Sequence, residues 1–229
     1  ELSGDIEVDV LNAMGFDATC LGNHEFDYGM EQFLALAEKA EFPYVSVNFT
    51  KEGEPVFAPY VIIEAEGAKI AFLGISTPKT ITTSTPTYFQ NEAGEYIYGF
   101  CQGEEGAELY NAVQASVDAA RAEGADIVIA MAHLGIEYDC TPWTSSEVIT
   151  ATTGIDVVLD GHSHSVIEGD LVKNKDGEEV LLTSTGTKLE NIGMLTIGTD
   201  GAAKSTLISN ASTVEFVAGI EEQFEALIN

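Results

Sequence analysis

Residues 11–29 read LNAMGFDATCLGNHEFDYG and join an apolar, strand-like run to a polar turn that carries a histidine. The apolar run is Ala18 to Leu21, and Gly22-Asn23-His24-Glu25 follows it directly. Glycine allows close backbone approach to a bound group, and α/β proteins place their chemistry in loops at strand ends. This stretch therefore predicts an α/β fold with a site that begins where a strand ends.

All four histidines of the 229-residue chain lie in three motifs of this kind. Ala132-His133-Leu134-Gly135 follows the apolar run Ile127 to Met131, and Gly161-His162-Ser163-His164 follows Val157 to Leu159. Positions i and i+2 of an extended segment face the same way, so His162 and His164 can converge. One histidine at a strand end is most often an ordinary surface residue. Four in matching contexts predict a shared site.

The remaining sequence predicts helices that alternate with strands, followed by antiparallel strands and a final helix. The long segment Thr77 to Gly103 is rich in Thr, Tyr and Gly, and we expect it to be irregular. The expected helices are Ile6 to Met14, Met30 to Ala40, Ala107 to Ala122, Ser145 to Thr150 and Phe216 to Ile228. The expected strands are Asp17 to Leu21, Tyr44 to Asn48, Tyr60 to Glu64, Lys69 to Ile75, Asp126 to Ala132 and Ile155 to Leu159, then the antiparallel Val166 to Lys173, Glu178 to Ser184, Gly193 to Gly198 and Ala203 to Ser209.

The charge balance limits the possible partners. The chain has 38 acidic and 9 basic residues and a formal net charge of −29, which excludes a nucleic acid polymer or an anionic membrane as a natural partner. No apolar run approaches the ~20 residues that span a bilayer, so we expect no membrane insertion. Arg121 is the one arginine, so bound metal would have to supply most of the positive charge for an anionic substrate.

Imidazole and carboxamide groups together suit Zn, Mn, Fe or Co better than Ca or Mg. Cys20, Cys101 and Cys140 show no C-x-x-C spacing, which excludes a thiolate-rich structural zinc site; Cys101 and Cys140 could pair or remain free thiols. Two transition metals ~3.5–4 Å apart would bind a phosphoryl group and activate a hydroxide. The histidine motifs thus favour metal-dependent phosphate chemistry.

These motifs resemble the metallophosphoesterase (calcineurin-like) superfamily, and specifically its 5′-nucleotidase branch. The similarity is nearly continuous from Leu11 to Gly29, and the extension Phe26-Asp27-Tyr28-Gly29 makes it more specific than Gly-Asn-His-Glu alone. The resemblance implies an α/β sandwich of two mixed β-sheets flanked by helices. It also implies hydrolysis of phosphate esters.

The resemblance further implies roles for six residues. Asn23, His133 and His162 would bind one metal, and His164 would bind a second. His24 would be the general acid that protonates the leaving oxygen, oriented by Asp27. Asp27 could instead be a helix N-cap before Met30.

Two features of the superfamily, an upstream Asp-x-His pair and a bridging Gly-Asp, have no counterpart in this sequence. We interpret Asp5 as a helix N-cap rather than as the bridging carboxylate. We therefore expect a partial catalytic domain over residues 1–212, incomplete at its N-terminus, and a linker helix over residues 213–229 towards a C-terminal nucleotide-recognition domain. The intact protein would bind two divalent transition metals. This chain would bind at most one well and would be weakly active or inactive.

The function implied is that of a 5′-nucleotidase in nucleotide catabolism, secreted or otherwise extracytoplasmic. Within the same family, a nucleotide-sugar pyrophosphatase or a 2′,3′-cyclic nucleotide phosphodiesterase is an alternative. From another class, the alternative is a non-catalytic metal-binding surface module. Retention of both His24 and Asp27 argues against the last, since metal binding alone needs neither.

Overall fold

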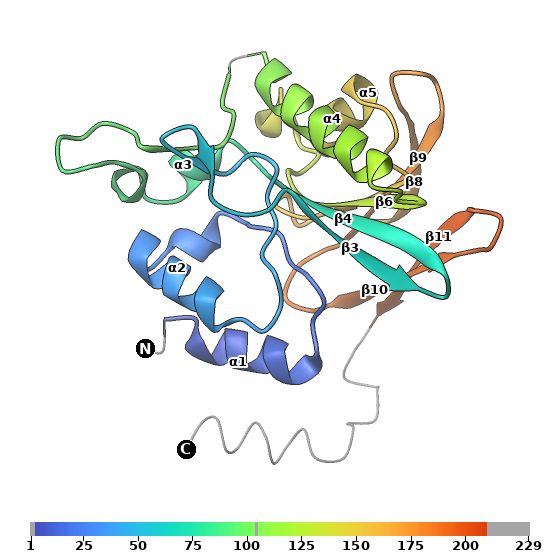
Figure 1. The fold of residues 1–229 in the computed structure, drawn as a ribbon, viewed down its shortest axis with the longest axis horizontal. Helices are drawn as coiled ribbons and strands as arrows, with labels where there is room; N and C mark the ends of the chain where they lie inside the picture. Colours follow the sequence, from blue (N-terminus) through green and yellow to red (C-terminus); the bar gives the residue numbers. More distant parts are fainter. Residues whose placement is uncertain (1–2, 104, 210–229) are drawn as a thin grey trace.

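A computed structural model describes residues 3–103 and 105–209 of the chain (Figure 1). The helices are α1 (Asp5–Met14), α2 (Met30–Lys39), α3 (Thr80–Thr83), α4 (Ala107–Ala122) and α5 (Ser145–Ala151), with short 3-10 turns η1 (His24–Phe26), η2 (Pro86–Phe89) and η3 (Tyr138–Cys140). The strands are β1 (Thr50–Lys51), β2 (Glu54–Pro55), β3 (Tyr60–Ala65), β4 (Ala68–Ser76), β5 (Tyr98–Gly99), β6 (Ile127–His133), β7 (Val157–Asp160), β8 (Val166–Lys173), β9 (Glu179–Thr185), β10 (Asn191–Ile197) and β11 (Ala203–Ser209).

A six-stranded mixed sheet in the order β3-β4-β6-β7-β9-β8 forms the centre of the molecule. Strands β4, β6, β7 and β9 are parallel, and β3 and β8 are antiparallel to their neighbours at the two edges. The parallel pairing of β9 with β7 corrects the expectation that β9 is purely antiparallel. The chain reverses once into β8 at the edge and again into β9, so β9 runs in the direction of β7.

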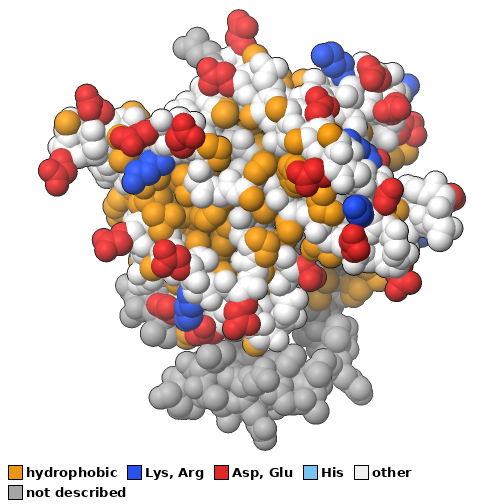
Figure 2. All heavy atoms as spheres, in the orientation of Figure 1, with side chains coloured by type: hydrophobic (Ala, Val, Ile, Leu, Met, Phe, Trp, Pro, Cys, Tyr) orange, Lys and Arg blue, Asp and Glu red, His pale blue; other side chains and the backbone are white. Residues whose placement is uncertain are grey.

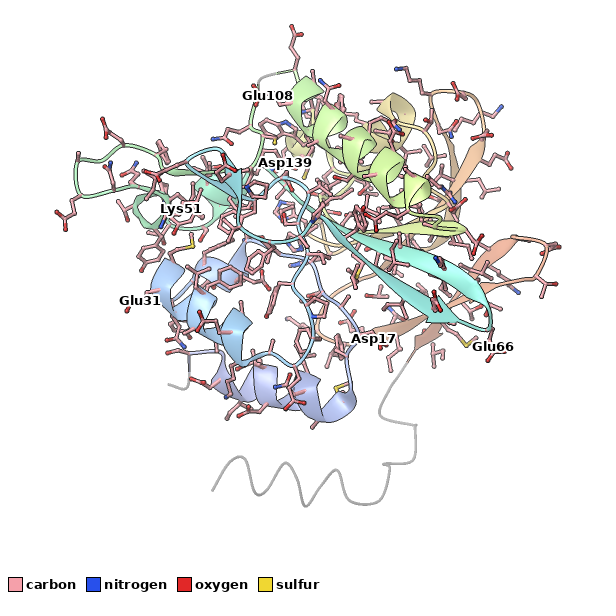
Figure 3. All side chains as sticks on the ribbon, in the orientation of Figure 1. Asp17, Glu31, Lys51, Glu66, Glu108 and Asp139 are labelled. Atoms are coloured by element: carbon pink, nitrogen blue, oxygen red, sulfur yellow. The ribbon has the colours of Figure 1, made fainter. Side chains whose placement is uncertain are left out.

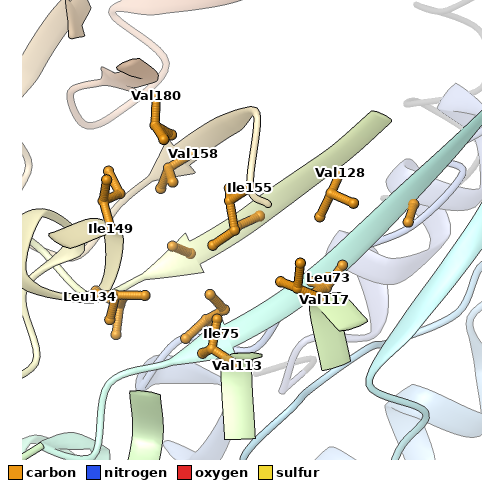
Figure 4. Close-up of a cluster of buried hydrophobic side chains, with 14 of the residues drawn as sticks. Leu73, Ile75, Val113, Val117, Val128, Leu134, Ile149, Ile155, Val158 and Val180 are labelled. Atoms are coloured by element: carbon orange, nitrogen blue, oxygen red, sulfur yellow. The ribbon is translucent and has the colours of Figure 1, made fainter. Parts of the chain in front are cut away.

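Strict alternation along the strands divides the core into two layers. In β6, Val128 and Ala130 face helices α4 and α5, and Figure 4 shows Val128 in this buried cluster. Ile127 and Ile129 pack on the other face of the strand. Residues Leu195 and Ile197 of the β10–β11 hairpin cover that second face. The hairpin and the central sheet therefore form a sandwich with helices on the outside, which confirms the predicted α/β class.

A separate aromatic cluster attaches the N-terminal helices to this sandwich. Phe26 is fully buried, and its ring centroid lies 4.9 Å from that of Phe33 on α2 and 5.1 Å from that of Phe89. Tyr98 and Phe100 of the irregular segment 77–103 are buried in the same cluster. These aromatic side chains anchor the segment to the domain, and because Phe26 directly precedes Asp27, the cluster also holds the first histidine motif in place.

The structure corrects three local predictions. The segments expected as strands at 17–21 and 44–48 form only an isolated bridge between Thr19 and Tyr44, because few of their backbone groups meet partners within the described part of the chain. Asp5 is the first residue of α1 rather than its N-cap, which is Gly4. Gly29, not Asp27, is the N-cap of α2. The expected helix 216–228 lies outside the described residues.

Carboxylates are spread over the face of the molecule seen in Figure 2 rather than gathered into one patch. This distribution agrees with solvated surface charge as the role of most acidic residues. All three cysteines are free thiols. None of the described helices has the length and apolar character needed to span a membrane.

Candidate metal centre

Three side chains from distant parts of the chain converge on one point. His133 Nε2 lies 2.9 Å from Asn23 Oδ1 and 3.2 Å from His162 Nδ1. Two ligand atoms that each bind the same ion at about 2.0–2.1 Å lie about 2.9–3.4 Å from each other when the ligand–metal–ligand angle is between a right angle and the tetrahedral angle. Both distances from His133 Nε2 therefore fall in the range for ligand atoms that share a single transition-metal ion. Among the described residues, no three His, Cys, Asp or Glu side chains form such a group by themselves, so the amide of Asn23 completes the set.

Parallel strand pairing brings the two histidines together. His133 is the last residue of β6, and His162 follows β7, which pairs with β6 in parallel. The carboxyl ends of parallel strands meet at one edge of the sheet, where α/β proteins bind ligands. His133 is in phase with Ile127 and Ile129, so its side chain lies on the sheet face opposite α4 and α5.

A buried hydrogen-bond network holds Asn23 against the same edge. Ser76, which is paired with His133 in the register of β4 and β6, donates its hydroxyl to the carbonyl of Leu21 at 2.9 Å. The fully buried Asn48 accepts from the Ser76 amide at 3.1 Å and donates to the Ser76 carbonyl at 2.7 Å. The loop that carries Asn23 is thus connected to the strand that neighbours His133.

Asp160 connects the other two motifs. Its Oδ1 accepts the backbone N–H of Leu134 at 3.1 Å and of Gly135 at 3.2 Å. The carboxyl lies on β7 directly before Gly161 and His162, and it reaches across to the turn that follows His133. Burial raises its pKa, while hydrogen bonds from these backbone amides oppose the rise. Asp160 therefore sets the separation between the His133 and His162 motifs.

The electrostatics of the site suit metal binding. Burial lowers the pKa of His133 to about 4, with smaller contributions from His162, His24 and His164. Burial also lowers the pKa of His162. Both rings are therefore neutral at pH 7 and present lone pairs, which is the form that binds a metal. Glu25 is half-buried beside the site, and desolvation raises its pKa.

His24 lies outside this trio, at the exposed edge of the site. Its Nδ1 lies 2.8 Å from Asp27 Oδ2, and its side chain is 75% exposed. Because Asp27 engages Nδ1, the Nε2 atom is left available for another partner. The cavity beside His24 has a volume of about 570 Å³; it is lined by α1 and α2 with Glu25 and Tyr28, and neither His133 nor His162 borders it.

The Gly-His-Ser-His turn differs from the extended geometry expected from its spacing. His162 and His164 adopt φ of 77° and 54°, in the left-handed region that non-glycine residues seldom occupy. His164 is exposed, and its charge still acts on the pKa values of His133 and His162. A strained turn, rather than alternation along a strand, thus presents these two side chains at the same edge.

We expect the Asp160→Ala variant to weaken binding of Zn²⁺ or Co²⁺ by about 10–100-fold, the range for loss of groups that orient metal ligands. Asp160→Asn keeps one oxygen able to accept the two amides, so most of the affinity should return. Asp156 offers a matched control, because its Oδ2 accepts from the Val128 amide at 2.7 Å near the opposite ends of β6 and β7. Equal losses of metal affinity in Asp156→Ala and Asp160→Ala would contradict a positioning role.

Sequence reasoning did not find Ser76, Asn48 or Asp160. Each ends or directly follows a predicted strand, and Asp160 directly precedes a histidine motif. The sequence feature that could have identified them is a polar residue at the carboxyl end of a predicted strand. The contacts that give these residues a role join segments 25 to 55 positions apart, and no local pattern encodes them.

The chain matches the family model described as bacterial capsule synthesis protein PGA_cap over residues 3–186. It is 32% identical over 172 residues to the 2′,3′-cyclic-nucleotide 2′-phosphodiesterase/3′-nucleotidase of Haemophilus influenzae, covering 69% of this chain and 24% of that protein. It is 30% identical over 182 residues to the 5′-nucleotidase of Vibrio cholerae, covering 74% of this chain and 31% of that protein. The crystal structure of the calcineurin-like phosphoesterase YfkN from Bacillus subtilis superposes with a TM-score of 0.72 at 24% identity, covering 96% of this chain and 73% of that one.

Proposed function

Since the chain belongs to the PGA_cap family and to the 5′-nucleotidase branch of the metallophosphoesterase superfamily, we propose that it hydrolyses phosphate esters with the help of a divalent metal, and that nucleoside monophosphates are its preferred substrates. The observation that carries the proposal is the convergence of Asn23, His133 and His162 at 2.9 and 3.2 Å. The chain spans 24% of the length of the Haemophilus influenzae relative and 31% of the length of the Vibrio cholerae relative. The substrate preference of the whole protein is therefore proposed rather than taken from these relatives.

Asn23, His133 and His162 would hold the metal, and the donor set fits Zn, Mn, Fe or Co. A bound ion of this kind supplies Lewis-acid stabilisation of charge on the phosphoryl oxygens. His164 would hold a second ion together with ligands outside the described residues. The described residues supply one nearly complete ligand set, so we expect about one tightly bound metal per chain.

His24 would act as the general acid. Its Nδ1–H donates to Asp27, which keeps the ring oriented. The opposite nitrogen, Nε2, would then deliver a proton to the ester oxygen that leaves as the phosphorus–oxygen bond breaks. The 75% exposed side chain agrees with a group that meets substrate rather than one that packs or binds the first metal.

A cyclic-nucleotide phosphodiesterase/3′-nucleotidase activity is the second candidate, supported by the similarity to the Haemophilus influenzae relative. A nucleotide-sugar pyrophosphatase would use the same residues, but no contact in the structure favours it. A C-terminal nucleotide-recognition domain and an extracytoplasmic location remain part of the proposal for the whole protein. A non-catalytic module is disfavoured, because a 2.8 Å His24–Asp27 pair contributes nothing to metal binding alone.

The test is phosphate release from AMP and from 2′,3′-cyclic AMP by the chain loaded with Mn²⁺ or Zn²⁺, together with its metal content. We expect slow, metal-dependent release from AMP that stops on chelation and returns on reloading. Two tightly bound metals per chain would contradict the ligand assignment. Metal binding without release from either substrate would favour the non-catalytic module.

A further inference from the structure

A lysine stands beside the metal centre in an ion pair with an exposed carboxylate. Lys79 Nζ lies 2.7 Å from Asp139 Oδ2, and Figure 3 labels Asp139 near α3. The Lys79 side chain is 20% exposed and that of Asp139 is 69% exposed. Lys79 also borders a cavity of about 290 Å³ lined by Tyr96 and Trp143, which leaves its side chain room to change rotamer.

Both partners of this ion pair stand on segments that flank the half-buried His133 and His162. Thr77, two residues before Lys79, donates its amide to the His133 carbonyl at 2.9 Å. On the other side, a Cβ added at Gly135 would lie 3.1 Å from Cys140 Sγ and 3.4 Å from His162 Cδ2, so the segment that carries Asp139 lies against His162.

Two of the other cations are held in contacts away from the histidines. Arg121, the one arginine, donates to the carbonyls of Ala125 and Asp126 and to the carboxylate of Asp156, near the amino ends of β6 and β7. Lys39 pairs with Asp9 at 2.8 Å between α1 and α2. Arg121 is thus committed at the end of the sheet opposite to the histidines, and Lys39 is committed on the N-terminal helices.

We propose that Lys79 binds the phosphate dianion of the substrate and that Asp139 is the resting partner it leaves on binding. The inference rests on the proposed phosphoesterase function and names a residue that binds the phosphate group. Asp139 is largely exposed, so its release to water costs little, as for most surface ion pairs. The phosphate dianion carries more negative charge than the carboxylate it replaces, so it is the stronger partner for the lysine.

The alternative is a purely structural ion pair that holds the 138–143 segment in place. The two roles predict different results for the two partners. In a structural pair, loss of either residue has the same effect. In a phosphate-binding role, loss of Lys79 weakens binding, whereas loss of the competing charge at Asp139 strengthens it.

The experiment is calorimetric titration of inorganic phosphate into the metal-loaded chain. We expect Lys79→Met to weaken binding about tenfold or more, which is 1.4 kcal/mol or more. Lys79→Arg should stay within about threefold of the unchanged chain, and Asp139→Asn should bind about two- to threefold tighter. Lys39→Met removes the same charge from the remote pair with Asp9 and should leave the phosphate affinity unchanged.

Three results would overturn the proposal. The first is an unchanged phosphate affinity in Lys79→Met, and the second is an equal loss of phosphate affinity in Lys79→Met and Asp139→Asn. The third is that the unchanged metal-loaded chain binds no phosphate. Thermal melting of each variant separates these outcomes from misfolding, and Asp139→Asn tests the idea even where Lys79→Met is unstable. Turnover of AMP is measured separately. Phosphate binding that depends on Lys79, without turnover of AMP, would contradict the proposed enzyme activity but support the phosphate-binding role of Lys79. Turnover of AMP that is unchanged in Lys79→Met would support the enzyme activity but contradict that role.

Discussion

Replacing His133 by alanine is expected to abolish tight metal binding and, with it, phosphate release. His133 Nε2 is the atom that lies within 3.2 Å of both other donors, so its loss leaves Asn23 and His162 without the ligand between them. Loss of a direct ligand should exceed the about 10–100-fold effect of losing a group that only orients ligands. Equilibrium dialysis against Zn²⁺ or Co²⁺, with AMP turnover on the same samples, measures both effects.

Thermal melting makes the His133→Ala result specific. A ligand that binds only the folded chain raises its melting temperature, so metal should stabilise the unchanged chain and fail to stabilise the variant. The metal-free form of each protein gives the baseline from which the shift caused by metal is measured. Retention of tight metal binding in His133→Ala would remove His133 from the ligand set.

Replacing His24 by alanine is expected to slow AMP hydrolysis by roughly 10²–10⁴-fold, the usual contribution of a general acid, with unchanged metal content. The ribose oxygen of AMP is a poor leaving group and needs a proton as its bond to phosphorus breaks. The nitrophenolate of p-nitrophenyl phosphate leaves without one. The variant should therefore lose far more activity on AMP than on p-nitrophenyl phosphate.

Asp27→Asn provides the matched comparison, since it keeps the side-chain shape 2.8 Å from His24 Nδ1 and removes the charge that favours imidazolium. We expect a smaller loss than in His24→Ala, again concentrated on the poor leaving group. Loss of metal from His24→Ala would make His24 a ligand, and equal losses on both substrates would exclude its action as an acid.

Local pattern accounts for most of the elements that the sequence predicts. Helix α4 has the predicted bounds. The two strands predicted at 60–64 and 69–75 form β3 and β4, and they are joined by a tight turn at Glu66-Gly67, where both residues have positive φ. The contact between His24 and Asp27 is local as well, because three residues in a short turn bring the two side chains together. Periodicity and turn chemistry act over a few residues, so they can be read directly from the sequence.

Long-range packing decided the rest. The strand expected at 17–21 does not form a ladder, and β9 lies beside β7, because pairing depends on which backbone groups meet in space. Likewise, the sequence indicated that Asn23, His133 and His162 belong to one site, but their 2.9 and 3.2 Å separations join positions 110 and 29 residues apart. Ser76, Asp160 and Lys79 became interpretable only when the strand ends were assembled.

The sequence by itself determined the fold class and the residue types of the site, since the strand-turn-histidine motifs are contiguous and carry their own chemistry. Only the tertiary structure decided which atoms face one another, because a shared edge of parallel strands is created by the buried sheet. The same edge places Lys79 beside the histidines, and no spacing along the chain could have shown it.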